Sequence, residues 1–244
     1  MRIKIFVLLC LTAIMQFTNV TPLKASHYYY KQLSLKDGVT SAVRCILTDK
    51  QGFVWIGTKA GISRYDGHEL KKYVHSPNNP HSIPNNLIHQ IAEDEMSNIW
   101  ILTDKGIARY QRQSDDFFLP TDEKGNPIIA YSTCLTKDGV LFGSKDKVYF
   151  YSYRDSSLRL LQKLNKGSNF NISLLSLWNE HTVLCCSRWQ GLALLDLKTG
   201  KHRLPPFDCG KEIMNMLIDS QNRIWIAPYN EGIKCFTHNG ELVK

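Results

Sequence analysis

Short stretches of this chain alternate between apolar and polar residues, and that period of two indicates β-strands. In residues 42–48 the alternation places Val43, Cys45 and Leu47 on one face. Asp and Gly then supply the residues of a turn at 49–52. Three further strands are expected at 53–57, 62–65 and 70–74. No window of useful length has the period of a helix, so the pattern predicts an all-β protein.

The same four-strand pattern recurs along the chain. The segment 49–65 aligns with two others, 94–110 and 219–236. Two degenerate copies lie between these segments and carry leucine where the others carry tryptophan. The equivalent positions are Trp55, Trp100, Leu141, Leu184 and Trp225, at spacings of 45, 41, 43 and 41 residues. Four antiparallel strands at this interval are typical of a propeller blade.

The repeat therefore predicts a β-propeller of about five four-stranded blades. We favour an incomplete part of a larger propeller, with a small five-bladed ring as the alternative. A single blade cannot bury both of its faces, so blades stack around an axis. The large side chains of each second strand should join neighbouring blades, and burying one stabilises the fold by roughly 1.5–3 kcal/mol. We therefore interpret Trp55, Trp100 and Trp225 as structural. The blades are expected at about 39–75, 84–120, 129–164, 171–206 and 212–244.

The amino-terminal residues have the order of a secretory signal. Arg2 and Lys4 precede an apolar run at 5–17, and polar residues follow before Ala25. This order predicts a signal peptide over 1–25 and leaves 26–244 for the propeller, in an exported, periplasmic protein. An uncleaved membrane anchor is the alternative, although the apolar run is short for a bilayer. A strand expected at 28–35 has no blade of its own and could complete the final one.

Charge and cysteine content reduce the range of ligands that we expect. The formal net charge of +8 falls to +5 without residues 1–25, because 27 basic residues then face 22 acidic ones. No run of five like charges occurs, so no nucleic-acid contact is expected. Cys45 and Cys134 each lie four residues before an aspartate, at what we take to be the same place in two repeats. We interpret the cysteines as small buried hydrophobes, since none has zinc-ligand spacing.

At these residues the chain resembles the two-component-regulator propeller repeat, which occurs in the periplasmic sensor regions of bacterial hybrid two-component systems. The family pattern G-x-x-W-I-G-T-x-x-G-L-x-x-Y-D matches the segment 52–66 almost position by position. Its N-N start matches at Asn85 and Asn86. The resemblance covers about 28–244 and is weaker in repeats three and four, where the tryptophan is replaced and the turn is shortened.

The resemblance implies a signalling context. In the family, a membrane segment and a histidine kinase with regulator modules follow the propeller, the ligands are often glycan-derived oligosaccharides, and the sensors form homodimers. We accordingly expect a ligand-sensing domain that recognises an oligosaccharide or another small ligand. This sequence contains no kinase and no regulator module, so any kinase activity would lie in a parent polypeptide. We expect no enzyme in this chain.

Catalytic and metal-binding patterns were sought as rivals to a sensor. The sequence has no Gly-rich phosphate loop, no H-E-x-x-H and no G-x-S-x-G. His75 and His81 share one loop without an acid between them, which favours a solvated link between blades over a metal site. Asp49 and Asp94 are explained by turn geometry. No catalytic residue, metal site or cofactor is expected.

Strand order suggests where a ligand would bind. In an up-and-down blade, the loop between the second and third strands opens on the same side as the link to the next blade. Aromatic rings beside Arg, Asn and Gln suit sugars or other amphipathic ligands. The candidate residues on these loops are Lys59, Lys105, Arg188, Trp189, Gln190, Tyr229 and Asn230. Packing against a neighbouring blade or a dimer partner is the alternative role for the two aromatic residues.

Two rival functions remain open from the sequence. A stand-alone propeller enzyme acting on glycans, such as a lyase or hydrolase, would need paired carboxylates or a Tyr/His pair converging at the axis. A protein-interaction scaffold would need no small-molecule site. Oligosaccharide binding separates the sensor from the scaffold, and turnover assays detect the enzyme.

Overall fold

The computed structural model describes residues 32–33, 42–164 and 170–243. The chain divides into two compact units, Met1–Leu33 and Ser34–Lys244, and the strands of the described residues lie in the second. The expected signal peptide and all but two residues of the expected strand at 28–35 are outside the described residues. None of the described segments forms an apolar helix of bilayer-spanning length.

Nineteen strands form five antiparallel sheets within the described residues. The first sheet contains β1 (Val43–Thr48), β2 (Val54–Thr58), β3 (Gly61–Tyr65) and β4 (Leu70–Tyr73). The second contains β5 (Ile88–Glu93), β6 (Ile99–Thr103), β7 (Gly106–Gln111) and β8 (Asp116–Phe118). The third contains β9 (Ser132–Thr136), β10 (Gly139–Ser144), β11 (Lys147–Ser152) and β12 (Leu158–Lys163).

The fourth sheet contains β13 (Ile172–Asn179), β14 (Thr182–Ser187), β15 (Gly191–Asp196) and β16 (His202–Arg203). The fifth contains β17 (Ile213–Ile218), β18 (Ile224–Pro228) and β19 (Lys234–Phe236). In every sheet the strands neighbour one another in chain order, so each sheet is an up-and-down meander. The first strands lie side by side from sheet to sheet: β1 by β5, β5 by β9, β9 by β13 and β13 by β17.

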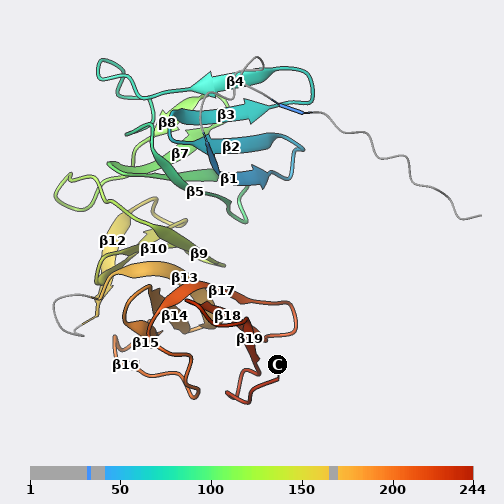
Figure 1. Ribbon diagram of the computed structural model, residues 1–244. Coiled ribbons are helices and arrows are strands. Elements are labelled where there is room, and N and C mark those ends of the chain that lie inside the picture. The colour runs from blue at the N-terminus through green and yellow to red at the C-terminus, as the bar shows by residue number, and fades with distance from the viewer. Residues whose placement is uncertain (1–31, 34–41, 165–169, 244) are drawn as a thin grey trace, which may run out of the picture. The chain divides into compact units, whose positions relative to one another are not determined.

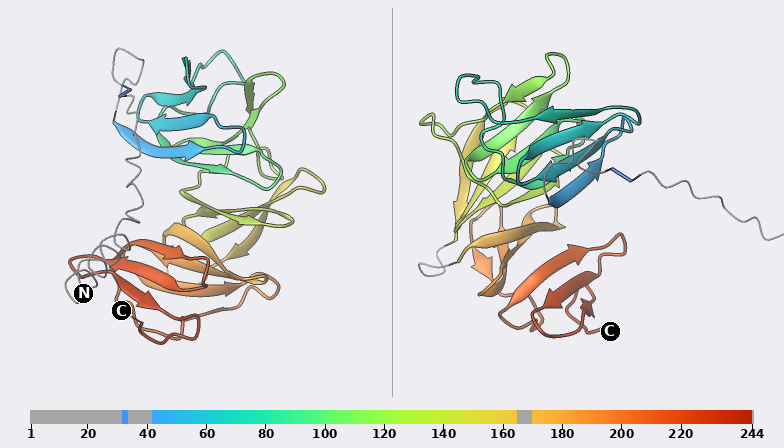
Figure 2. Two further views of the ribbon diagram at one scale, coloured as in Figure 1. Left: turned by 90° about the vertical axis from the view of Figure 1, so that its right-hand side faces the viewer. Right: turned by 45° about the horizontal axis from the view of Figure 1, so that its top comes forward.

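The sheets are propeller blades that follow one another from β1–β4 at the top of Figure 1 to β17–β19 at the bottom. The two turned views in Figure 2 show the same succession. The all-β, blade-repeat prediction is confirmed, and the strands of the first blade begin and end within one residue of their expected bounds. This accuracy follows from period-two alternation, which is a local property of each strand.

A hydrogen bond between an aspartate and a tryptophan fixes the turn of three blades. The Asp49 carboxylate accepts hydrogen bonds from the Phe53 amide at 2.9 Å and from the Trp55 indole nitrogen at 3.0 Å. Trp100 donates to Asp94 at 2.7 Å, and Trp225 donates to Asp219 at 2.8 Å. Each aspartate thus closes the turn and orients the indole of the same hairpin. The structural interpretation of these tryptophans is confirmed.

The indoles also join neighbouring blades. Trp55 lies edge-on to Tyr110 of the next blade, with ring centroids 4.8 Å apart and an angle of 65° between the planes. Trp100 repeats this contact with Tyr151 at 4.8 Å and 64°. Arg109, which is paired with Trp100 across the sheet, donates to the Tyr151 hydroxyl at 2.8 Å. Both tryptophans are fully buried.

Glycine at one position lets neighbouring blades approach closely. A Cβ at Gly57 would lie 2.8 Å from Ile88 of the next blade. At the equivalent Gly143, a Cβ would lie 2.6 Å from Ile172. Such distances are below normal carbon–carbon contact, so a side chain here would push the blades apart.

Two sequence expectations were wrong in detail. The fifth sheet has three strands within the described residues, and a single bridge between Phe236 and Leu242 continues it. Cys45 and Cys134 are not equivalent, because Cys45 pairs with Gly57 whereas Cys134 pairs with Leu141, the counterpart of Trp55. The turn between β9 and β10 is shorter than that between β1 and β2, so counting back from the aspartate shifts the register.

Candidate ligand-binding sites

The loops that follow the second strand of each blade lie beside the links between blades. The Gly61 amide donates to the Asn86 carbonyl at 2.8 Å, next to the β2–β3 loop. Ile172 and Ile213, which begin β13 and β17, donate their amides to Lys145 and Arg188 at 2.8 and 2.9 Å. The expectation that these loops and the links share one rim is confirmed.

The structure brings the candidate loops of the fourth and fifth blades together. The link residues 211–213 run between them: the Ile213 amide donates to Arg188 at 2.9 Å, and the Tyr229 amide donates to Glu212 at 2.8 Å. Trp189 and Tyr229 are 62% and 51% exposed, so neither ring is used in a blade core. The Arg188 guanidinium lies 5.1 Å from the Trp189 ring centroid, within cation–π range. Gln190 and Asn230 are exposed beside these rings in sequence.

Lys59 and Lys105 form a second pair in the same manner. Both side chains are exposed, in the β2–β3 and β6–β7 loops. Their loops flank one link, since Gly61 donates to Asn86 and Asp104 donates to Leu87. The hydrogen bonds therefore place each candidate pair around its own link, one between blades one and two and the other between blades four and five.

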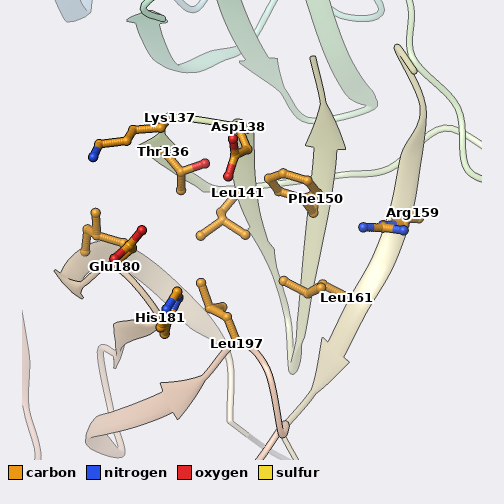
Figure 3. A pocket seen from close by; sticks show the side chains of 11 residues that line it. Thr136, Lys137, Asp138, Leu141, Phe150, Arg159, Leu161, Glu180, His181 and Leu197 are labelled. Carbon is orange, nitrogen blue, oxygen red and sulfur yellow. The ribbon is translucent and has the colours of Figure 1, made fainter. Parts of the chain in front are cut away.

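A pocket of about 410 Å³ lies between the third and fourth blades, and the sequence analysis missed it. Figure 3 shows the β9–β10 turn with Asp138 facing the β13–β14 turn with Glu180 and His181, across the side chains of Leu141, Leu161 and Leu197. These turns join the first strand of a blade to its second, so they lie on the opposite rim from the candidate loops.

The pocket combines an apolar wall with a charged mouth. Leu141, Phe150, Leu161, Leu177 and Leu197 form the apolar lining. Asp138, Glu180 and His181 are exposed at the mouth with Lys137 and Arg159. The Arg159 guanidinium lies 5.8 Å from the Phe150 ring centroid. A volume of this size is ordinary for a small-molecule site. The signal that could have predicted it is the leucine at position 141, where the repeat elsewhere carries tryptophan.

The cysteines behave as buried hydrophobes. Cys134, Cys185, Cys186, Cys209 and Cys235 are buried, and Cys45 is half-buried. Burial raises the pKa of Cys134 to about 12 and that of Cys209 to about 11. Within the described residues no group of three His, Cys, Asp or Glu side chains is placed to hold a metal ion. The packing role expected for the cysteines is confirmed for the described ones.

Fold and blade junctions together define the chain as a β-propeller. Residues 37–60 match the family profile of the two-component regulator propeller. A segment that includes the first strands of the first blade is therefore similar to that repeat, and the resemblance drawn from the sequence is confirmed.

Solved structures share the fold. The extracellular domain of the putative hybrid two component system BT3049 from B. thetaiotaomicron has a TM-score of 0.71 and 19% identity over 86% of this chain. The extracellular domain of the putative one component system BT4673 from the same organism has a TM-score of 0.69 and 18% identity over 87% of this chain. The chain spans 30% and 32% of those two structures.

A local sequence match points to the same class of protein. Histidine kinase P4 from Formosa agariphila is 37% identical over 59 residues, which are 24% of this chain and 4% of the kinase. The chain thus covers a small part of that relative.

Proposed function

We propose that this chain is a ligand-sensing part of a periplasmic two-component signalling protein and that it recognises glycan-derived oligosaccharides. Three findings support a sensor role: the two-component regulator propeller profile, the local match to a histidine kinase, and the fold shared with extracellular domains of putative signalling systems. The chain binds, and the catalytic output of the signal belongs to another part of a parent polypeptide.

The observation that carries the proposal is the pair of exposed aromatic rings around the link 211–213. Trp189 and Tyr229 leave more than half of their surface open, although burying them would be favourable. A flat ring can pack against the apolar face of a sugar, and nearby polar groups fix its orientation through the hydroxyls. Arg188, Gln190 and Asn230 supply those groups. Lys59 and Lys105, around the link between blades one and two, would favour acidic sugars as a separate pair.

The proposal includes a location and a partner. Cleavage after the signal peptide 1–25 would deliver residues 26–244 to the periplasm. There the propeller would act within a homodimer of the parent sensor. A bound ligand changes signalling only if it has different affinities for two states of that dimer.

Isothermal titration calorimetry with a panel of neutral and acidic oligosaccharides tests the proposal. We expect saturable binding by the mature chain and a loss of at least about tenfold in affinity for Trp189→Ala and Tyr229→Ala. Met96→Ala is the matched control, because Met96 is 66% exposed on the β5–β6 turn of the opposite rim. Equal affinity in all three variants would place the ligand elsewhere.

The same experiment separates the rival functions. Shortening of an oligosaccharide during incubation would replace the sensor with a glycan-degrading enzyme. Absence of binding to every member of the panel, together with capture of a defined partner protein by the wild type and not by Trp189→Ala, would favour an interaction scaffold.

A further inference from the structure

The pocket between blades three and four occupies the place where the other blades insert an indole. Strand register makes Leu141 the counterpart of Trp55 and Trp100: each lies three residues before the end of its second strand. Each is paired with the fourth residue of the third strand, which is Arg64, Arg109 or Phe150. At the junction between blades three and four, leucine therefore replaces the tryptophan, and phenylalanine replaces the arginine that pairs with it.

The fourth blade, which faces Leu141, also carries a smaller side chain at this junction. Tyr110 and Tyr151 contact the indoles of the preceding blades. In its own blade, each tyrosine pairs with the residue just before Trp100 or Leu141. In the fourth blade that register position belongs to Leu195, which pairs with Val183. The 3–4 junction therefore lacks both the indole and the phenol that fill the 1–2 and 2–3 junctions.

The 4–5 junction shows that this loss can be compensated. There Leu184 also stands in for the tryptophan, but Trp178 from the end of β13 packs into the same cluster. Its indole stacks on Phe207 with ring centroids 6.3 Å apart, and Phe207 stacks on Phe236 at 4.5 Å. At the 3–4 junction the pocket of about 410 Å³ remains.

We propose that this pocket binds a compact aromatic molecule that carries an N–H donor, of the size and chemistry of indole. Leu141 forms part of the pocket wall at the position that an indole occupies in the first two blades. At the mouth, Asp138 brings a carboxylate from the β9–β10 turn, three residues before Leu141. In the first two blades a turn carboxylate, that of Asp49 or Asp94, accepts the indole N–H. The Asp138 carboxylate faces the Leu141 side of the pocket, whereas the Lys137 ammonium points away (Figure 3).

The two carboxylates at the mouth of the pocket suit a ligand that donates a hydrogen bond. Asp138 and Glu180 approach it from opposite blades, so a ligand N–H or amine meets carboxylates on two sides. Arg159 is already placed against the Phe150 ring. The site is independent of the oligosaccharide surface proposed above, because it lies on the other rim and shares no residue with it.

Calorimetric titration of the mature chain with indole itself tests the proposal. We expect saturable binding and a loss of at least tenfold in affinity for Leu141→Trp, which restores the residue that the repeat carries elsewhere and fills the pocket. Leu204→Trp is the control: it adds the same side chain at a position that is 67% exposed and should leave the affinity unchanged. Circular dichroism and a urea midpoint establish that the Leu141→Trp chain is folded.

A second measurement isolates the hydrogen bond and does not depend on Leu141→Trp. 1-Methylindole has the same shape without the donor, and one hydrogen bond to a charged acceptor corresponds to roughly a tenfold difference in affinity. Wild type should prefer indole by roughly tenfold, and Asp138→Ala should lower this preference.

Three results would overturn the proposal. These are the absence of saturable indole binding to the wild type, unchanged binding in the folded Leu141→Trp chain, and no preference for indole over 1-methylindole in the wild type. Oligosaccharide binding that is lost in Leu141→Trp would instead assign the pocket to sugars.

Discussion

Trp100 of the second blade lies edge-on to Tyr151 of the third, with ring centroids 4.8 Å apart and planes inclined by 64°. Trp55 and Tyr110 repeat the arrangement one blade earlier with the same separation. A geometry that recurs at two junctions is a property of the repeat itself. Edge-to-face pairs add about 0.5–1.5 kcal/mol beyond the burial of their surface.

Replacing Trp100 by leucine should destabilise the fold by roughly 2–4 kcal/mol, since it removes a fully buried indole and leaves a cavity. It also leaves Asp94 without its indole donor. Urea unfolding measures the change in free energy. Trp225→Leu is the comparison: Trp225 is only half-buried, so its loss should cost less. Equal costs would show that the indole contributes through its own hairpin rather than through the junction.

Asp115 should make stability depend on pH between about 4 and 2. Burial opposes its ionisation, but hydrogen bonds from Lys71, Tyr110 and Tyr73 and the charge of Arg64 outweigh burial and lower its pKa from 3.8 to about 2. The carboxylate is 30% exposed, so we expect a contribution of about 1–2 kcal/mol. Because the folded pKa is the lower one, this stabilisation is present above pH 4 and is lost as the pH falls toward 2.

The measurement for Asp115 is the unfolding free energy of wild type and Asp115→Asn from pH 6 to pH 2. Asparagine is chosen because residue 115 has a φ of 55°, which asparagine tolerates. The difference between the two chains should shrink through the stated window. A constant difference at every pH would contradict the assigned pKa.

Gly57→Ala should destabilise the first blade junction by roughly 1–3 kcal/mol. The new Cβ would lie 2.5 Å from Cys45 Sγ and 2.8 Å from Ile88 Cγ2, so two strands must move. Gly232→Ala is the matched control, because nothing lies within 4 Å of its Cβ position. Thermal unfolding of both variants provides the comparison. Similar midpoints would mean that the junction accommodates the methyl group without loss of stability.

The buried thiols should react slowly with a thiolate-specific reagent at pH 8. Burial raises the pKa of Cys186 to about 12 and that of Cys45 to about 11, so the reactive thiolate is scarce in the native chain. Mass spectrometry of a Cys10→Ser chain labelled in buffer and in urea checks this. Labelling should be far faster in urea, and Cys45, the most accessible in the fold, should lead in buffer. Rapid native labelling of Cys185 would contradict the packing.

The strands and the structural tryptophans were predictable because their signals are local. Alternation sets each strand, and the aspartate that holds Trp55 or Trp100 lies six residues before it in the chain. The shared rim of the loops followed from strand order alone. The register of Cys134 did not, because a shortened turn changes the count without changing the composition.

The pocket at the 3–4 junction could not be predicted from the sequence, for a different reason. Its cause is the coincidence of Leu141, Phe150 and Leu195, and each of these is an unremarkable core residue when considered alone. Only the packing of two blades shows that all three replacements meet at one place. The sequence did contain the clue of a missing tryptophan, but it could not show that Trp178 compensates at one junction and that no residue the structure describes does so at the other.

The hydrogen bond between Asp49 and Trp55 has a consequence for how the fold assembles. It is made within one hairpin, so the ring is already aimed before the adjoining blade arrives. Docking then proceeds with less loss of rotational freedom, as for a preorganised ligand meeting its receptor. The hairpin that contains Leu141 lacks this restraint, so its side chains are less ordered before the fourth blade packs on them. We therefore expect the fourth blade to be the slowest to add.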